Sequence, residues 1–245
     1  MRTLRYGPYR IVLDRGRDLS FPIDREGRTL AFSLPGAAFK TFEGGGFVGD
    51  VRRGGSCNVE TLHLTPHGNG THTECYGHVS GRRLFITDLQ TDWMFPGVLA
   101  SIDIEPGTAV TLDDLPEYAV QQLAQEEVKG LILHVRSLPR LPFDFSDYDA
   151  PYVEETLAAW LSGRVDHLLT NLPSLDHRTS TALAAHHAFL GRAPLRKTVT
   201  ELLDIPADLS DGLYWTVIMT PAIATDAVPS RPVVYPMEVL GDEAV

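Results

Sequence analysis

Apolar strands alternate with amphipathic helices through the second half of this 245-residue chain. The predicted strands cover residues 98–104, 131–135 and 167–172, and the predicted helices cover residues 117–128, 153–161 and about 180–190. Strands that are joined through helices usually pair in parallel within one sheet. The order therefore predicts an α/β fold, with helices packed on the faces of a sheet.

Composition and charge narrow the class of protein. Hydrophobic residues make up 43% of the chain and charged residues 22%, which is typical of a globular domain, and no repeat or linker divides residues 1–245. We therefore expect a single domain. A net charge of −11 provides no basic surface for phosphate groups, so we expect neither nucleic acid nor a membrane as a partner.

Cysteine content and hydropathy indicate a compartment. Cys57 and Cys75 are the only cysteines, too few for a disulfide framework, and no stretch of about 20 apolar residues is present. The N-terminal segment is charged and lacks an apolar core. We expect a cytoplasmic protein in a reducing environment.

Three histidines and a carboxylate lie within the twelve residues from 67 to 78, which read His-Gly-Asn-Gly-Thr-His-Thr-Glu-Cys-Tyr-Gly-His. In an extended strand, side chains two residues apart share a face, so His72 and Glu74 should point together, and a bend at residues 76–77 would return His78 toward them. Imidazole and carboxylate groups bind Zn²⁺, Mn²⁺ and Fe²⁺. The pattern predicts a divalent-metal site, although the stretch contains no His-Glu-x-x-His helix and no Cys-x-x-Cys pair.

A glycine-rich segment, residues 41–55, precedes this stretch. Its composition predicts a loop, and a loop beside a site can act as a lid or simply as a connection.

The stretch resembles the signature of the cyclase family of metal-dependent hydrolases, which includes kynurenine formamidases (arylformamidases) and isatin hydrolase. That signature reads His-x-Gly-Thr-His-x-Asp-x-Pro-x-His, and residues 70–72, the acid at 74 and His78 match it in register. There are three departures. His67 lies one residue early, Glu74 replaces the aspartate, and Tyr76 replaces the proline.

A second cluster of polar residues follows the predicted strand 167–172. The resemblance extends to it, because family members carry a Ser-x-Asp after a strand, a histidine on the next helix and a glutamate in the following strand; here these correspond to Ser174, Asp176, His186 and Glu201. His186 and His187 are adjacent on a helix and diverge by about 100°, so at most one should face the site. The resemblance favours His186. A carboxylate among apolar strand neighbours, as at Glu201, needs a partner that a cation would supply, unless the side chain faces solvent.

The resemblance implies a swivelling β/β/α-type mixed sheet with flanking helices, expected as a homodimer, and a metal-dependent hydrolase of a small amide or cyclic amide, similar to arylformamidase in tryptophan catabolism. One or two zinc or manganese ions would be held by five ligands, namely His67, His72, Glu74, His186 and Glu201. His78 would be the catalytic general base and acid. Three further residues are candidates to orient a ligand or to line a pocket for a small-molecule substrate, namely Asp176, Tyr76 and Trp93.

Three alternatives remain open from the sequence. The chain could bind metal without hydrolysing a substrate, because His67 is shifted and Glu74 is one methylene longer than the family aspartate. It could hydrolyse a small ester or lactone. It could instead use Cys75 as a nucleophile, although no base is evident beside this thiol.

Overall fold

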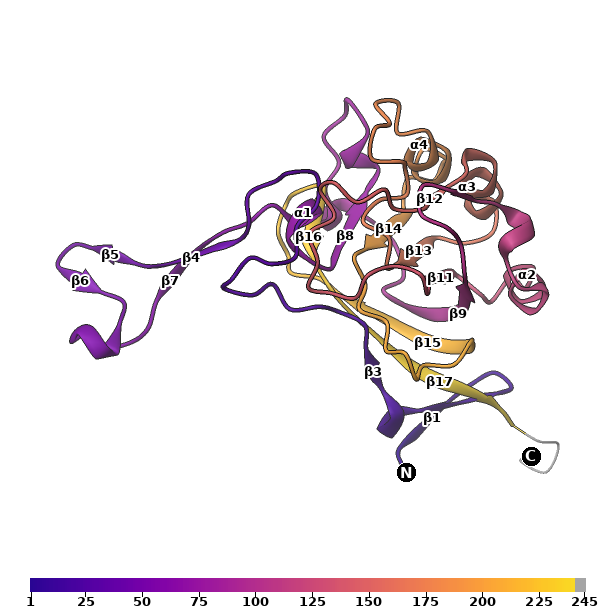
Figure 1. The fold of residues 1–245 in the computed structure, drawn as a ribbon. Coiled ribbons are helices and arrows are strands. Elements are labelled where there is room, and N and C mark those ends of the chain that lie inside the picture. The colour runs from indigo at the N-terminus through magenta and orange to yellow at the C-terminus, as the bar shows by residue number, and fades with distance from the viewer. Residues whose placement is uncertain (241–245) are drawn as a thin grey trace.

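The computed structural model describes residues 1–240, and a large mixed sheet runs through this part of the chain. The strands are, in spatial order, β1 (Thr3–Tyr6), β2 (Tyr9–Val12), β17 (Arg231–Val239), β15 (Gly212–Met219), β9 (Met94–Ile102), β11 (Gly130–Val135), β13 (His167–Thr170), β14 (Thr198–Glu201), β8 (His72–Cys75) and β16 (Ala227–Pro229), with β3 (Arg17–Asp18) against β17. The helices are α1 (Pro66–Asn69), α2 (Glu117–Leu123), α3 (Glu155–Ser162) and α4 (Ala184–Leu190). Figure 1 shows this arrangement.

Smaller elements complete the described chain. Three two-stranded ladders pair β4 (Ala38–Thr41) with β7 (Glu60–His63), β5 (Glu43–Gly44) with β6 (Phe47–Val48), and β10 (Ala109–Val110) with β12 (Tyr152–Val153). Short 3₁₀ turns are η1 (Leu13–Arg15), η2 (Val51–Arg53), η3 (Tyr76–His78), η4 (Ile86–Asp88) and η5 (Leu112–Asp114). Among the residues described, none of the helices combines the length and the apolar character needed to cross a membrane.

The centre of the sheet confirms the predicted fold class. β9, β11, β13 and β14 are parallel neighbours, and α2, α3 and α4 lie in the connections between them. Antiparallel strands flank this parallel block on both sides, because β15 pairs with β9, and β8 pairs with β14. The sheet is therefore mixed, as the resemblance implied.

Two helices are shorter than predicted, each for a local reason. α2 ends at Leu123 rather than at residue 128. Glu126 and Glu127 follow it, and negative charge opposes the dipole at the carboxyl end of a helix. α4 begins at Ala184 rather than near residue 180, because Leu183 has a φ of +46°, outside the helical range.

The core is divided between the two faces of the sheet. Along β11, Leu131, Leu133 and Val135 pack with α2, α3 and α4, whereas Ile132 packs on the opposite face with Phe95. The side-chain period of two along a strand produces this division. The helix-bearing face also carries Val199 of β14. Glu201 lies two positions further along this strand and therefore points toward α4.

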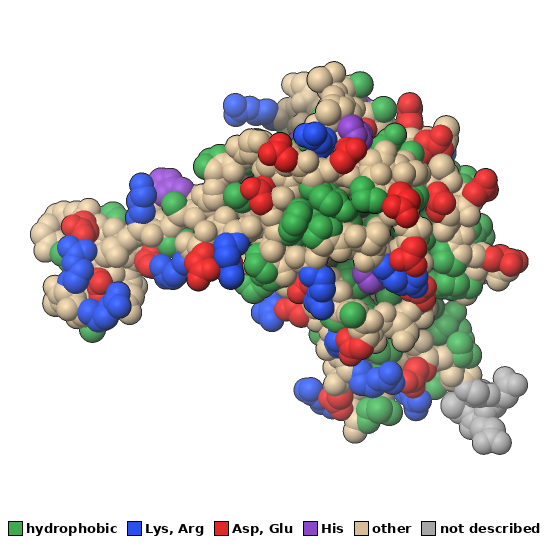
Figure 2. Space-filling model, viewed as in Figure 1, with side chains coloured by type: hydrophobic (Ala, Val, Ile, Leu, Met, Phe, Trp, Pro, Cys, Tyr) green, Lys and Arg blue, Asp and Glu red, His purple; other side chains and the backbone are tan. Residues whose placement is uncertain are grey.

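An arm formed by residues 38–63 extends away from the rest of the molecule (Figure 1). The segment predicted as a loop, residues 41–55, is a β5–β6 hairpin followed by η2. In Figure 2, Lys, Arg, Asp and Glu side chains are interspersed along the arm. Phe42 and Leu62 are exposed on it. The homodimer that the family resemblance implies stays a prediction.

Strand register brings distant parts of the sequence together. β8 lies between β14 and β16, with His72 opposite Glu201 and Glu74 opposite Ala227. Residues from the start, the middle and the end of the chain therefore meet around β8.

Candidate metal centre

β8 carries two of the candidate ligands on one face. His72 and Glu74 are fully buried, while Thr73 between them points to the other face and hydrogen-bonds to Thr200 and Ser230. The structure therefore has the alternation that the sequence predicts. The Nδ1 atom of His72 lies 3.0 Å from the carbonyl oxygen of Gly70, which fixes this ring and leaves Nε2 facing inward.

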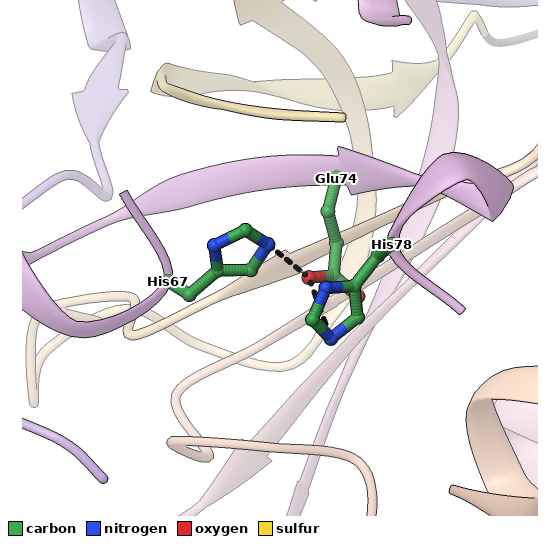
Figure 3. A group of neighbouring side chains, drawn as sticks. All are labelled: His67, Glu74 and His78. Atoms are coloured by element: carbon green, nitrogen blue, oxygen red, sulfur yellow. Dashed lines mark ion pairs between the residues drawn. The ribbon is translucent and has the colours of Figure 1, made fainter. Parts of the chain in front are cut away.

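His67 and His78 approach Glu74 from the two ends of β8. His67 lies on α1 before the strand, and His78 lies on η3 after it. Their Nε2 atoms are 3.6 Å and 3.9 Å from Oε2 of Glu74 (Figure 3). The two rings stack with their centroids 4.4 Å apart. The bend predicted at residues 76–77 is thus present and returns His78 to the cluster.

Glu201 and His186 lie on the other side of His72 and Glu74. Oε2 of Glu201 is 3.4 Å from Nε2 of His72, and Oε1 is 3.4 Å from Nε2 of His186. Nε2 of His186 is also 3.0 Å from Oε1 of Glu74. Glu201 faces inward at the end of a buried strand, so its carboxylate lies in the cluster and not in solvent.

Asp176 holds His186 from outside the cluster. Its Oδ2 atom is 2.6 Å from Nδ1 of His186, and its carboxylate accepts hydrogen bonds from the backbone N–H groups of Ala185 and His186. One side chain therefore caps α4 and orients the imidazole, so that Nε2 points toward Glu74 and Glu201.

The protonation equilibria reflect this crowding. Burial opposes the charged form of His186, but the negative charge of Glu74 and the hydrogen bond that His186 donates to Asp176 outweigh it, and the pKa of His186 lies well above its ordinary value. Burial likewise opposes ionisation of Glu201, yet contacts with His186 and His72 hold its pKa far below the usual range.

Unpaired polar atoms gather in this cluster. Seven buried side-chain nitrogen or oxygen atoms in the described residues have no hydrogen-bond partner, and five of them belong here, namely Nε2 of His67, His72 and His186 and both carboxylate oxygens of Glu74. Buried polar groups are rarely left unpaired, because each such group costs about 1–3 kcal/mol. A cation among these atoms would satisfy them together.

The distances also fit a metal ion. Ligands bound at about 2.1 Å in a tetrahedral site lie about 3.4 Å from one another. The contacts of Glu201 with His72 and His186 are both 3.4 Å, and that of Glu74 with His67 is 3.6 Å. Residues 1–240 contain two groups of mutually close candidate ligand atoms, one of His67, Glu74 and His78 and one of His72, Glu74 and Glu201. Glu74 belongs to both, so the donor set fits one ion or two.

A cavity of about 370 Å³ adjoins the cluster. Phe32, Leu34 and Leu183 form apolar walls, and Arg178 contributes a cationic side chain. The polar lining residues include His67, Glu74, His78, His186 and Glu201. A larger cavity of about 560 Å³ elsewhere in the molecule includes none of these groups.

Strained backbone borders this site. Leu202, which follows Glu201, has a φ of +55°, and Leu183 in the cavity wall has a φ of +46°. Side-chain-bearing residues rarely occupy this left-handed region, and such positions concentrate at functional sites.

Two predicted substrate residues lie elsewhere. Tyr76 packs edge-on against His187 with ring centroids 6.2 Å apart, and Trp93 packs between two hydrophobic clusters near His167. Neither lines the cavity beside the candidate ligands. His187 is exposed, so of the two adjacent histidines only His186 enters the cluster.

Asp226 is a member of the cluster that the sequence did not indicate. Its Oδ2 atom lies 3.2 Å from Nε2 of His67 and 3.6 Å from Nδ1 of His78. Contacts with His67 and then His78 lower the pKa of this carboxyl group far below its usual range. A lone acid in the run Thr-Asp-Ala-Val carries no local signal, and only the pairing of β16 with β8 brings it to the site.

Known structures share this fold. A structure described as a potential metal-dependent hydrolase with cyclase activity has a TM-score of 0.66 and 17% identity, covering 91% of this chain and 98% of its own. A predicted metal-dependent hydrolase from Bacillus stearothermophilus has a TM-score of 0.61 and 17% identity, covering 90% and 98%. Isatin hydrolase A from Labrenzia aggregata, bound to benzyl benzoate, has a TM-score of 0.64 and 15% identity, covering 91% and 94%.

Sequence comparison gives the family. No curated protein matches the chain. The model of the Cyclase family, described as "Putative cyclase", matches residues 17–177, more than half of the sequence. That range includes β8 and the histidines on both sides of it, while the structure adds His186 and Glu201 from beyond it. The chain belongs to the Cyclase family.

Proposed function

We propose that this protein is a metal-dependent hydrolase of a small aryl amide or cyclic amide, similar to arylformamidase. The observation that carries the proposal is the set of five unpaired buried atoms beside an apolar-walled cavity. The hydrolases among the structures of similar fold support it.

Burial divides the histidines into two groups. The side chains of His72 and His186 are 0% and 2% exposed, so their ring nitrogens are shielded from solvent and suit metal binding. His67, Glu74 and Glu201 supply the remaining ligand atoms. A divalent ion held there, zinc or manganese, would supply an acidified water and would polarise a carbonyl oxygen.

His78 suits proton transfer better than metal binding. Its side chain is 27% exposed and lines the cavity, so a substrate can reach its ring. Burial lowers the pKa of His78, but Asp226 and Glu74 outweigh this and raise it above its ordinary value. His78 would take a proton from the attacking water and return it to the leaving nitrogen.

The cavity suggests the type of substrate. Phe32, Leu34 and Leu183 would contact an apolar or aromatic group, and the scissile carbonyl would lie over Glu74 and His78. The cavity volume of about 370 Å³ suits a small molecule and not a polypeptide.

A hydrolysis assay tests the proposal. The zinc- or manganese-loaded protein would be incubated with an aryl formamide, a cyclic aryl amide, an aryl ester and a lactone, and product release would be followed by absorbance. We expect turnover of an amide, and a fall in kcat of about 10²–10⁴-fold for His78→Gln with metal content unchanged. His187→Gln is the matched control, because His187 is exposed and outside the cavity.

Two results would contradict the proposal. Exclusive turnover of the ester or lactone would show an esterase or lactonase. No turnover of any substrate by fully metal-loaded protein would show a metal-binding member of the family that lacks this activity.

A further inference from the structure

Asp226 lies against the stacked pair of His67 and His78. Its Oδ2 atom is 3.2 Å from Nε2 of His67 and 3.6 Å from Nδ1 of His78. Its other oxygen, Oδ1, accepts a hydrogen bond from the hydroxyl of Thr225. The side chain does not line the cavity, so it reaches a substrate only through the histidines.

The backbone fixes the place of this carboxylate. The carbonyl oxygen of Asp226 accepts a hydrogen bond from the N–H of Cys75, the residue after Glu74, and Thr225 accepts one from Ile86. Gly77 permits the approach, because a Cβ atom there would lie 2.0 Å from the carbonyl oxygen of Leu84 and 3.2 Å from Cβ of Asp226. The position of Asp226 is therefore built into the pairing of β16 with β8.

His78 lies between two carboxylates that face different ring nitrogens. Nδ1 faces Asp226, whereas Nε2 faces Oε2 of Glu74 at 3.9 Å. His186 has the same arrangement, with Nδ1 on Asp176 and Nε2 toward Glu74 and Glu201. Two histidines of the cluster are thus each flanked by a carboxylate on the Nδ1 side.

A neutral imidazole carries one N–H, and a carboxylate beside one nitrogen favours the tautomer with the proton there. Building on the function proposed above, we propose that Asp226 is a positioning residue that keeps Nδ1 of His78 protonated. The unprotonated nitrogen of His78 is then Nε2, which faces Glu74 and the reacting groups. Without Asp226, the ring populates both tautomers and rotates more freely.

The test compares wild type with Asp226→Asn in the zinc-loaded protein, because zinc is diamagnetic. Long-range ¹H–¹⁵N spectra of protein labelled at histidine report which ring nitrogen carries the proton, and the spectrum of His78→Gln assigns the His78 signals. We expect a protonated Nδ1 in wild type and a mixture of tautomers in Asp226→Asn. The zinc content should be the same in both proteins.

Kinetics provide the second readout. Loss of a residue that orients a histidine typically costs about 10–100-fold in activity, so kcat of Asp226→Asn should fall by that factor while KM stays near the wild-type value. Asp208→Asn is the matched control. Asp208 is an exposed acid paired with Arg17 away from the site, and its removal changes the net charge by the same amount.

Three results would overturn the inference. The first is a protonated Nε2 of His78 in wild type, the second is an unchanged tautomer or kcat in Asp226→Asn, and the third is loss of zinc from Asp226→Asn, which would make Asp226 a ligand. If wild type hydrolyses no substrate, the proposed function fails, while the tautomer spectra still decide whether Asp226 positions His78.

Discussion

Replacing Glu74 with glutamine should abolish binding at every metal position in the cluster. Glu74 is shared by both groups of candidate ligands, whereas His67 and His72 each belong to one. The amide has nearly the shape of the carboxylate but no charge, so the packing around β8 should survive. We therefore expect Glu74→Gln to fold and to lose its response to zinc.

The size of the response follows from binding linkage. A ligand present at 1,000 times its dissociation constant stabilises the folded state by about 4.1 kcal/mol. With about 2.1 cal/mol/K of unfolding entropy per residue, a chain of 245 residues has about 0.5 kcal/mol/K, so one zinc ion should raise Tm by about 8 °C.

The assay is thermal unfolding of protein stripped with a chelator and then titrated with zinc. We expect wild type to show the full rise in Tm and Glu74→Gln to show none. Glu127→Gln, at an exposed position, is the matched control and should respond as wild type does. A full rise in Tm for Glu74→Gln would contradict this prediction, because zinc would then be bound elsewhere.

Three further predictions concern other residues. Burial lowers the pKa of His167 to about 3, whereas the same side chain in the unfolded chain has a pKa near 6.5. Below pH 6.5 the unfolded chain therefore binds a proton that the folded state does not, and the free energy of unfolding decreases as the pH is lowered. We expect wild type to lose about 2 kcal/mol more unfolding free energy than His167→Gln between pH 7 and pH 5, measured by denaturant unfolding; equal changes in the two proteins would contradict this. Burial raises the pKa of the Cys75 thiol to about 11, so Cys75→Ser should keep its kcat, and loss of turnover at full metal loading would favour a thiol nucleophile. Leu183→Ala should raise KM because Leu183 lines the cavity, whereas Trp93→Leu should not; the reverse pattern of KM values would place the substrate elsewhere.

Local sequence patterns predicted the parts of the site that lie within one element. The alternation in β8 was enough to place His72 and Glu74 on one face, and the bend after it was enough to return His78. The strand and helix order predicted the parallel centre of the sheet. These features depend on neighbouring residues, which a sequence displays directly.

The other features of the site depend on pairing between strands that are far apart in the sequence, which local patterns do not reveal. Asp226 follows His78 by 148 residues and reaches it only because β16 pairs with β8. The aromatic character of Trp93 could not distinguish a pocket wall from a core residue, since both environments favour large apolar side chains. The arm of residues 38–63 was likewise hidden, because glycine and charge are as common in an exposed hairpin as in a loop.

We expect residues from β8, α4 and β14 to form one metal site. Anomalous diffraction from crystals grown with zinc would test this expectation, because the signal locates the ion itself. We predict a peak in contact with Glu74 and within bonding distance of at least one of His186 and Glu201. A zinc peak away from Glu74, or none there in protein that carries a full equivalent of zinc, would contradict it.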